Sequence, residues 1–562
     1  LRIESYEKVL THNLANLRTT LGEDSPELIK YLGLLYSIRN LPTSRDEIHH
    51  RQTQVEFIKR LLWELYSKNS RVREFIDENL KLFNGQQGNP ESFCHLEEVL
   101  SEQHFRLSFW KVATEEINYR RFFNINELIC VRQEDENVFS HYHSLLKKLC
   151  TEGIVDGLRV DHVDGLYEPN EYLKKLRELT TSGYIVVEKI LQPKEPLPGF
   201  WPVEGTTGYD ALYWINQVFV MRKNQRAFDR LYQSFTGLKE RYHTLFYKAK
   251  RHIIEHEMMG DMDNLAMLLK GLSGKMRYSR DFTIYGLKEA LVEFLSHLPV
   301  YRTYIDHVHY RAFDKLVIER TIEQAKLQRP ELGHELQFIF NVLTLSPEAV
   351  TGATEEVFHF IKRLQQFTGP LMAKGFEDTL LYVYNRLLSL NEVGGSPEIF
   401  GVTLREFHEF MKKRASSWPL SMNATSTHDT KRGEDIRARL NVLSEMPALW
   451  QRCVLKWSKT NERFKTTLKT LKVPDANEEY FIYQTLIGSF PFQDEIDETY
   501  IKRIKEYLLK SLRESKVHTS WVNPDHAYEE AVMKFLDGVL KNRAFLKDFL
   551  RVKNMVAFYG ML

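Results

Sequence analysis

Two apolar segments, each ending in an acidic residue, enclose one predicted helix in the middle of the chain. The first segment contains Ile154, Val155, Leu158 and Val160 and ends at Asp161; the second is the run 184–187 (YIVV), which ends at Glu188. Between them, leucines recur every third residue from 171 to 180, which predicts an amphipathic helix. Strand, helix and strand within about 30 residues form a βαβ unit. The sequence therefore predicts two carboxylates at the carboxyl ends of neighbouring parallel strands, the functional face of a β/α barrel.

Arg159 stands two residues before Asp161 and, in a strand, leaves by the same face. A guanidinium beside a carboxylate keeps that carboxylate ionised, as a glycosyl-transfer nucleophile requires. The alternative is a purely structural ion pair. A metal cluster of Asp161, His162 and Asp164 is disfavoured, because strand alternation sends Asp161 and His162 to opposite faces. We therefore expect no metal and no organic cofactor.

A third segment, 421–440 (SMNATSTHDTKRGEDIRARL), places His428 and Asp429 after a strand-like stretch and before a helix that begins near Glu434. The residue types around Asp429 are also those of helix caps, which is the structural alternative. Three carboxylates at strand ends suit glycosyl transfer: one attacks C1 of a sugar, one protonates the leaving oxygen, and one stabilises the oxocarbenium-like transition state.

These segments resemble the maltooligosyltrehalose synthase family of the α-amylase superfamily. The resemblance also covers segments 103–128, 197–212 (LPGFWPVEGTTGYDAL) and 373–401 (AKGFEDTLLYVYNRLLSLNEVGGSPEIFG). The Glu188-Lys189 pair and the run HDTKR from His428 to Arg432 distinguish this family from ordinary amylases. The resemblance implies that Asp161 is the nucleophile, Glu188 the general acid/base and Asp429 the transition-state stabiliser.

Candidate substrate contacts are, by the same resemblance, Arg159, His162, Lys189, Tyr209, His428, Lys431 and Arg432. Structural alternatives stay open for several of them. Lys189 is equally well a solvated cation. For Tyr209, which follows Gly205 and Gly208, loop packing is slightly favoured over a substrate contact. Lys431 and Arg432 are ambiguous.

The family activity implied is an intramolecular transglucosylation that converts the reducing-end α-1,4 linkage of maltooligosaccharides to α,α-1,1, an isomerase reaction. A sequential partner enzyme, maltooligosyltrehalose trehalohydrolase, is implied as well. Two other functions remain open: an α-1,4-glucan hydrolase of the same superfamily, and an inert fragment that only binds oligosaccharide.

The expected fold is of the α/β class, an incomplete TIM-type (β/α)8 barrel with large α-helical insertions and a predominance of helix. We expect a helical insertion at 1–114, a barrel segment with nucleophile and acid/base at 115–215, a helical insertion with a further barrel strand at 216–415, and a barrel segment with the third carboxylate followed by helices at 416–562. The segment Leu298–Ile305 (LPVYRTYI) is the predicted further strand. Barrel strands are expected to be lacking at both ends, since a closed barrel needs eight.

The amino-acid composition limits the classes of partner and the location that we expect. The 77 lysines and arginines balance 76 aspartates and glutamates, so no global field favours nucleic acid or an anionic membrane. Four cysteines, scattered without a CxxC pair, indicate reduced thiols and a cytoplasmic location. No apolar stretch approaches the roughly 18 residues of a membrane span.

Overall fold

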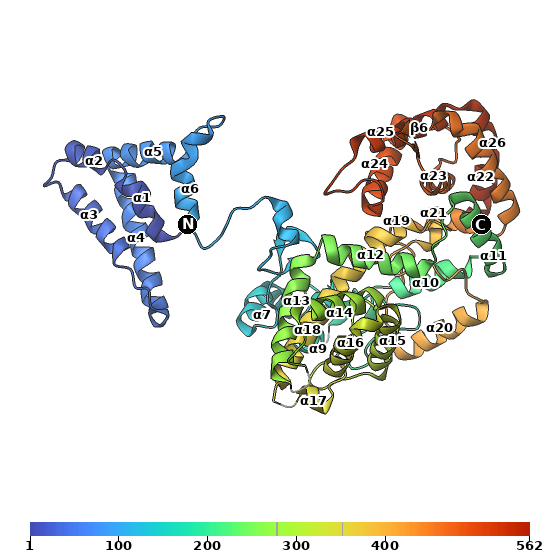
Figure 1. Ribbon diagram of the computed structural model, residues 1–562, viewed down its shortest axis with the longest axis horizontal. Helices are drawn as coiled ribbons and strands as arrows, with labels where there is room; N and C mark the ends of the chain where they lie inside the picture. The colour runs from blue at the N-terminus through green and yellow to red at the C-terminus, as the bar shows by residue number, and fades with distance from the viewer. Residues whose placement is uncertain (181–182, 277–278, 351) are drawn as a thin grey trace. The chain divides into compact units, whose positions relative to one another are not determined.

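The computed structural model describes residues 1–180, 183–276, 279–350 and 352–562. The chain divides into two compact units, Leu1–Trp110 and Lys111–Leu562 (Figure 1). We describe each unit by itself.

The first unit is helical throughout its regular structure. Its α-helices are α1 (Tyr6–Thr11), α2 (Leu14–Leu21), α3 (Pro26–Arg39), α4 (Ile48–Lys68), α5 (Ser70–Asn84) and α6 (Cys94–Ser101). Leu34 and Ile38 of α3, Leu65 of α4 and Val72 of α5 meet in one buried cluster. Each such side chain contributes about 1.5–3 kcal/mol by leaving water, which is enough to hold three amphipathic helices together.

The second unit is also predominantly helical, as predicted. Its α-helices are α7 (Glu136–Tyr142), α8 (Ser144–Thr151), α9 (Pro169–Thr180), α10 (Tyr209–Val218), α11 (Gln225–Thr236), α12 (Tyr242–His256), α13 (Met259–Lys275), α14 (Ile284–His297), α15 (Ala312–Gln328), α16 (Gly333–Leu343), α17 (Pro347–Val350), α18 (Thr354–Met372), α19 (Leu381–Val383), α20 (Leu404–Ser417), α21 (Glu434–Leu443), α22 (Pro447–Asn461), α23 (Ala476–Ser489), α24 (Glu498–Ser515), α25 (His526–Lys541) and α26 (Arg543–Met561). A π-helical turn, Ala373–Leu380, continues α18.

A parallel sheet in the order β3-β4-β5 lies in this unit, formed by β3 (Gly157–Val160), β4 (Tyr184–Val187) and β5 (Gly205–Thr206). Val160 pairs with Val187, and Val187 pairs with Thr206, so the three strands end at one edge. With α9 between β3 and β4, the predicted βαβ unit is confirmed. Two hairpins complete the strands of the described ranges: β1 (Arg121–Phe122) with β2 (Ile125–Ile129), and β6 (Thr466–Leu468) with β7 (Leu471–Val473).

The predicted strand at Leu298–Ile305 is wrong. This segment is buried but forms no strand, because a side chain takes the place of a neighbouring strand. Gln365 of α18 accepts from the Ile305 amide at 2.7 Å and donates to the Ile305 carbonyl at 3.1 Å. Side-chain amides satisfy buried backbone groups in this way without a ladder.

The strand-like stretch before His428 also forms no strand in the described chain. Met422 makes a single backbone hydrogen bond, donating to the Thr206 carbonyl of β5 at 3.1 Å. One such bond places the segment against the sheet without extending it. The predicted helix near Glu434 is confirmed as α21.

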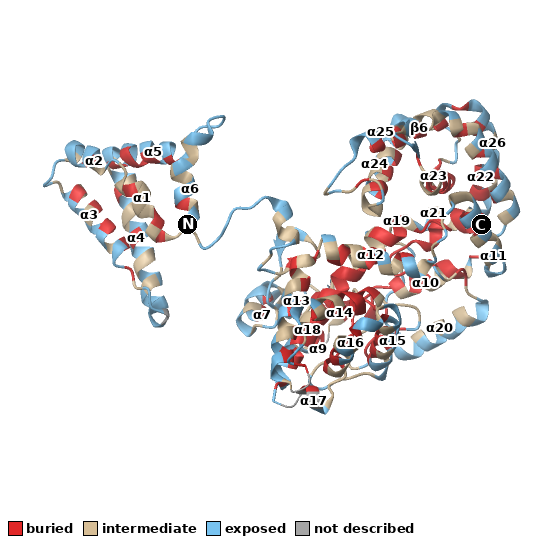
Figure 2. Ribbon diagram, viewed as in Figure 1, coloured by how far each residue is buried: buried red, intermediate tan, exposed pale blue. Residues whose placement is uncertain are grey.

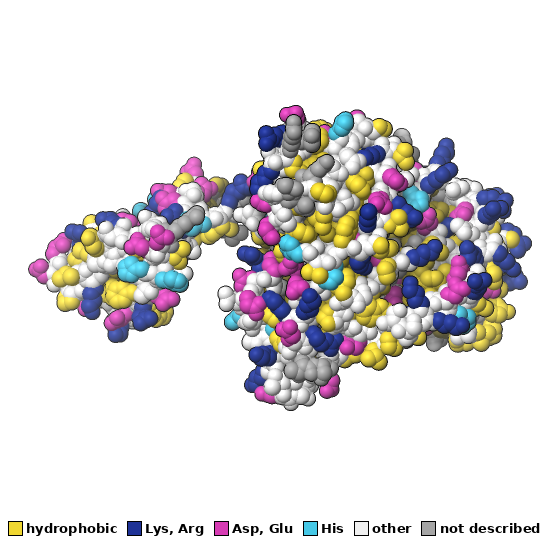
Figure 3. Space-filling model, turned by 90° about the horizontal axis from the view of Figure 1, so that it is seen from below, with side chains coloured by type: hydrophobic (Ala, Val, Ile, Leu, Met, Phe, Trp, Pro, Cys, Tyr) yellow, Lys and Arg dark blue, Asp and Glu magenta, His cyan; other side chains and the backbone are white. Residues whose placement is uncertain are grey.

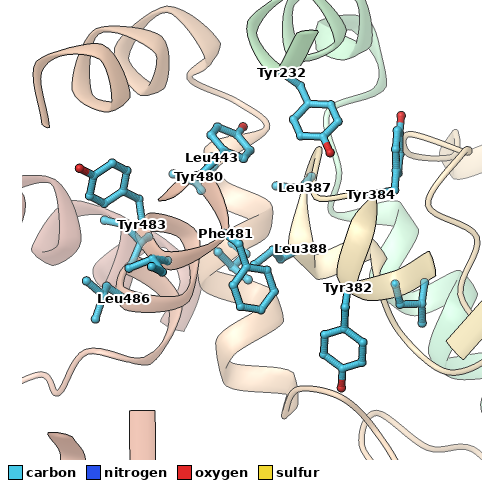
Figure 4. Close-up of a cluster of buried hydrophobic side chains, with 14 of the residues drawn as sticks. Tyr232, Tyr382, Tyr384, Leu387, Leu388, Leu443, Tyr480, Phe481, Tyr483 and Leu486 are labelled. Carbon is cyan, nitrogen blue, oxygen red and sulfur yellow. The ribbon is translucent and has the colours of Figure 1, made fainter. Parts of the chain in front are cut away.

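Buried side chains concentrate where helices face one another within the second unit (Figure 2). In its largest apolar cluster, side chains of α23 face those of the segment 382–388, with Phe481 next to Leu388 (Figure 4). The TIM-type barrel itself stays a prediction, because the parallel sheet of the described residues contains β3, β4 and β5 alone.

The charged side chains on one face of the molecule are of both signs. On the face seen in Figure 3, acidic and basic side chains are interspersed, as the counts of 76 and 77 suggest.

Among the described residues, none of the helices is both long and apolar enough to cross a bilayer. The four cysteines, at 94, 130, 150 and 453, are free thiols.

Candidate active site

A cavity of about 410 Å³ opens at the edge where the three parallel strands end. Its walls carry acidic, basic and aromatic side chains together. They include Phe122, Phe123, Asp161, His162, Asp164, Glu188, Tyr301, Lys374, Glu377, Asp378, Tyr382, His428, Asp429, Thr430, Lys431 and Tyr507.

Asp161 and Glu188 are neighbours at this edge. Each follows directly on a strand whose last residues, Val160 and Val187, are paired in register, and the Glu188 amide donates to the Val160 carbonyl at 2.8 Å. Arg159 forms an ion pair with Asp161, as the shared strand face predicts. Hydrogen bonding to Asp161 raises the pKa of Arg159 against the opposing effect of partial burial. The predicted arrangement of the two acids is confirmed.

His162 departs from the predicted strand geometry. The strand ends at Val160, and His162 adopts a left-handed backbone conformation with φ of 46°. Asp161 and His162 therefore both line the cavity, and the prediction that they leave by opposite faces is wrong. The turn aims the His162 amide at Glu188 Oε2, to which it donates at 2.6 Å. Burial lowers the pKa of the His162 imidazole, so that the ring is neutral near pH 7.

The described residues gather a metal-compatible set of three donors in one place, Asp475, Glu478 and His518. Those side chains belong to the N-terminal turn of α23 and its surroundings, and they do not line the cavity.

Glu188 has the electrostatics of a group that exchanges a proton near neutrality. Burial raises its pKa to about 7, and the negative charge of Asp161 acts in the same direction. The His162 amide and Arg159 oppose these effects by stabilising the charged form. A general acid/base works best with a pKa near the working pH.

His428 and Asp429, on the loop before α21, also line the cavity. His428 Nε2 lies 3.0 Å from Asp429 Oδ2, and both side chains are exposed to the cavity or solvent. The helix cap of α21 is Gly433, so the structural alternative of capping does not apply to either residue.

Two glycines explain how this loop reaches the sheet edge. A Cβ on Gly205 would lie 2.4 Å from Ser421 Cβ, and one on Gly208 would lie 2.8 Å from the Met422 carbonyl oxygen. Both glycines have positive φ, 146° and 97°. Only glycine permits this backbone conformation and this close approach together.

A buried carboxylate fixes the far end of the same loop. Glu392 accepts from the Lys431 amide at 2.5 Å and from the Arg432 amide at 3.0 Å. Hydrogen bonds from amides to a carboxylate are about twice as strong as those between neutral groups. Glu392 therefore fixes the backbone of the loop at Lys431 and Arg432.

Three charged residues of the π-helical turn complete the wall and were not predicted from sequence. Tyr301 donates to Glu377, and burial raises the pKa of Glu377 to about 7. Burial acts to raise the pKa of Asp378, but Lys431 and Lys374 together lower it below its usual range. The signal was present in AKGFEDT, where charges interrupt an apolar run; π-turns are frequent at functional sites.

Several predicted substrate contacts do not line the cavity. Lys189 is the clearest correction: its ammonium is fully buried, 3.0 Å from Asp164 Oδ2 and 3.2 Å from Glu195 Oε1. These two carboxylates hold the Lys189 side chain in the interior, outside the cavity lining. It is therefore neither a solvated cation nor a cavity residue.

Arg432, Tyr209 and Arg159 also lie outside the lining. Arg432 is buried and donates to the Leu388 and Asn391 carbonyls. Tyr209 is buried and its hydroxyl accepts from Thr427 at 3.0 Å, which supports the loop-packing alternative. Lys431 does line the cavity, with Nζ 2.8 Å from Asp378 Oδ1.

Comparison with known proteins shows which proteins the chain resembles. The chain matches no protein-family model. It is 36% identical over 443 residues to a putative maltooligosyl trehalose synthase of Mycobacterium tuberculosis, strain H37Rv, covering 79% of this chain and 53% of that protein. The same figures hold for the protein of that name from strain CDC 1551 / Oshkosh.

Solved structures agree. The maltooligosyltrehalose synthase of Arthrobacter ramosus superimposes with a TM-score of 0.71 at 31% identity, over 85% of this chain and 57% of that one. A glycosyltrehalose synthase designated DSM5389 gives a TM-score of 0.67 at 36% identity, over 83% and 55%. The chain thus spans about half the length of the relatives that it matches. The predicted resemblance is confirmed.

Proposed function

We propose that this chain, which shares the sequence and fold of maltooligosyltrehalose synthases over about half their length, carries the reaction centre of an intramolecular transglucosylase. The observation that supports this most is the pairing of Asp161 with Glu188 at adjacent strand ends, with the pKa of Glu188 raised to about 7. An ionised carboxylate beside a protonated one is the pair that retaining glycosyl transfer uses.

In the first step, a carboxylate oxygen of Asp161 attacks C1 of the penultimate glucosyl unit of a maltooligosaccharide. The bond from C1 to the glycosidic oxygen breaks, and Glu188 gives its proton to that oxygen, releasing the reducing-end glucose. Asp429, which lines the same cavity, stabilises the positive charge that develops at C1.

In the second step, the released glucose turns within the cavity and presents its anomeric hydroxyl. Glu188, now a carboxylate, accepts the hydroxyl proton while the oxygen attacks C1 of the glycosyl enzyme and Asp161 departs. The product carries an α,α-1,1 linkage, and two displacements at C1 retain its configuration. His162, His428 and Lys431 are positioned to bind sugar hydroxyls during the turn.

Arg159 acts through Asp161, whose charge it holds in place, and Tyr209, Lys189 and Arg432 act as supports of the site. In this proposal the segments 115–215 and 416–562 contribute parts of a (β/α)8 barrel, and 1–114 and 216–415 are helical insertions. The part of 216–415 that lines the cavity limits the entry of water. A partner maltooligosyltrehalose trehalohydrolase would release trehalose from the product.

The test is incubation with maltopentaose, following reducing ends and, by NMR, the linkage of the product. We expect reducing ends to disappear without free glucose, and Glu188→Gln to abolish this change. A rise in reducing ends would instead establish a hydrolase. Binding of maltopentaose without any turnover would establish a binding fragment.

A further inference from the structure

A second cavity, of about 350 Å³, shares Phe123 with the one described above. Phe123 belongs to both walls, and α18 contributes Gly369 to the first cavity and Pro370 to the second. The second cavity contains none of the proposed catalytic residues. Its volume is in the range that small-molecule sites occupy.

Three guanidinium groups line this second cavity, those of Arg120, Arg121 and Arg363. Arg121 is neutralised, since its Nη2 lies 3.0 Å from Asp261 Oδ2. Arg120 and Arg363 form no ion pair among the described residues, although Asp261 of the same wall acts on both through its charge and Glu134 acts on Arg363. Arg120 donates to the Gly165 carbonyl at 2.5 Å and to Cys130 Sγ at 3.7 Å, and Arg363 donates to Gln366 Oε1 at 3.1 Å.

These two arginines, which form no ion pair among the described residues, are linked through Gln366. Gln366 accepts from Arg363 and donates to the Gly165 carbonyl at 3.0 Å, the same oxygen that Arg120 contacts. The pKa of Arg363 is lowered, first by burial and then by the positive charge of Arg120. Like charges held near each other in a half-buried wall cost free energy that an anion between them would recover.

A buried hydrogen-bond donor without an acceptor also favours a bound anion. Arg121 is 5% exposed, and its Nε is a buried donor without a hydrogen-bond acceptor among the described residues. Buried donors are rarely left unsatisfied in a folded protein. Apolar side chains, among them Leu265 and Phe367, form the other part of the wall.

We propose that this second cavity binds a phosphate monoester, with the phosphate between Arg120 and Arg363 and the organic part against the apolar wall. Guanidinium groups match phosphate oxygens in geometry and charge, which makes arginine pairs typical of such sites. The site is distinct from the sugar cavity, and it adds a ligand class that the transglucosylation does not need.

The test is calorimetric titration of the 562-residue chain with glucose 6-phosphate, inorganic phosphate and glucose. We expect glucose 6-phosphate to bind saturably, inorganic phosphate to bind more weakly, and glucose not to bind at this site. Arg363→Gln should weaken glucose 6-phosphate binding about tenfold or more, because a charged hydrogen-bond partner is lost. Arg405→Gln, at an exposed arginine of α20, is the matched control and should leave binding unchanged.

Arg120→Gln repeats the test at the second arginine, and thermal melting identifies a variant that has lost its fold. The proposal is overturned if glucose 6-phosphate fails to bind saturably, or if glucose binds equally well. Unchanged affinity in a folded Arg363→Gln or Arg120→Gln protein would overturn it too. So would displacement of glucose 6-phosphate by maltopentaose, since that would place it in the first cavity.

Discussion

The backbone amide of His162 donates a 2.6 Å hydrogen bond to Glu188 Oε2, so the residue after the proposed nucleophile holds the proposed acid/base. The bond depends on the left-handed turn at His162, where φ is 46°. It couples the geometry of the two acids, because Asp161 and His162 are adjacent in the chain. A shift of this backbone turn would therefore move both reacting groups.

The first prediction concerns the pH dependence of activity. The pKa of Glu188 is raised to about 7, and the first step needs its protonated form. We expect kcat/KM for maltopentaose to fall as the pH rises above about 7, approaching a tenfold loss per pH unit. The measurement is a pH profile of initial rates from pH 5 to 9. A flat profile over this range would count against Glu188 as the acid.

The second prediction concerns stability. A carboxyl group whose folded pKa is above its unfolded value of 4.5 stabilises the fold below about pH 4.5, and this contribution is lost as the pH rises to about 7. Glu188→Gln cannot ionise, so at pH 8 it should be more stable than the parent by about 1–3 kcal/mol. Urea unfolding at pH 5 and pH 8 measures this. The gain must be larger at pH 8, and an equal effect at both values would refute it.

The third prediction concerns Lys189, which neutralises Asp164 and Glu195 in the interior. Lys189→Met leaves two carboxylates without their shared cation and should lower the free energy of unfolding by about 3–5 kcal/mol at pH 7. Lys223→Met, at an exposed lysine, is the control and should stay within about 0.5 kcal/mol of the parent. If Lys189 were instead a substrate contact, the variant would keep its stability and lose affinity for maltopentaose.

The fourth prediction concerns the glycine contact that brings the His428–Asp429 loop to the sheet. Gly205→Ala places a Cβ 2.4 Å from Ser421 Cβ, so the loop must shift. We expect at least a tenfold loss of kcat together with a lower melting temperature. Gly271→Ala, where a Cβ meets nothing within 4 Å, should retain full activity and gain up to about 1 kcal/mol in stability. Equal behaviour of the two variants would remove the proposed role of Gly205.

The sequence could predict those elements of the site whose determinants lie within a few neighbouring residues. The strand run before Glu188 and the spaced leucines of α9 are complete signals within a few residues, and both elements form where expected. The strand predicted at Leu298–Ile305 failed because Gln365, 60 residues away from Ile305, supplies the hydrogen bonds of a missing neighbour. No pattern within the segment carries that information.

The charged residues of the site show the same limit. Glu377 and Lys374 were overlooked, because nothing local says that the π-turn faces the cavity. Lys189 was expected to be either a substrate contact or a solvated cation, but it pairs with Asp164 and Glu195 in the interior. Both partners lie outside the Glu188-Lys189 motif, so the motif alone does not reveal the ion pairs.

The most direct measurement of the central claim is the covalent intermediate at Asp161. Glu188→Gln should still form a glycosyl enzyme with α-maltosyl fluoride, because fluoride leaves without a proton, and should release it slowly for want of a base. Mass spectrometry of the digested protein would then find the maltosyl adduct on the peptide containing Asp161, and Asp161→Asn in the same background would lack it. An adduct on another acidic residue, or none while the fluoride is consumed, would contradict the account.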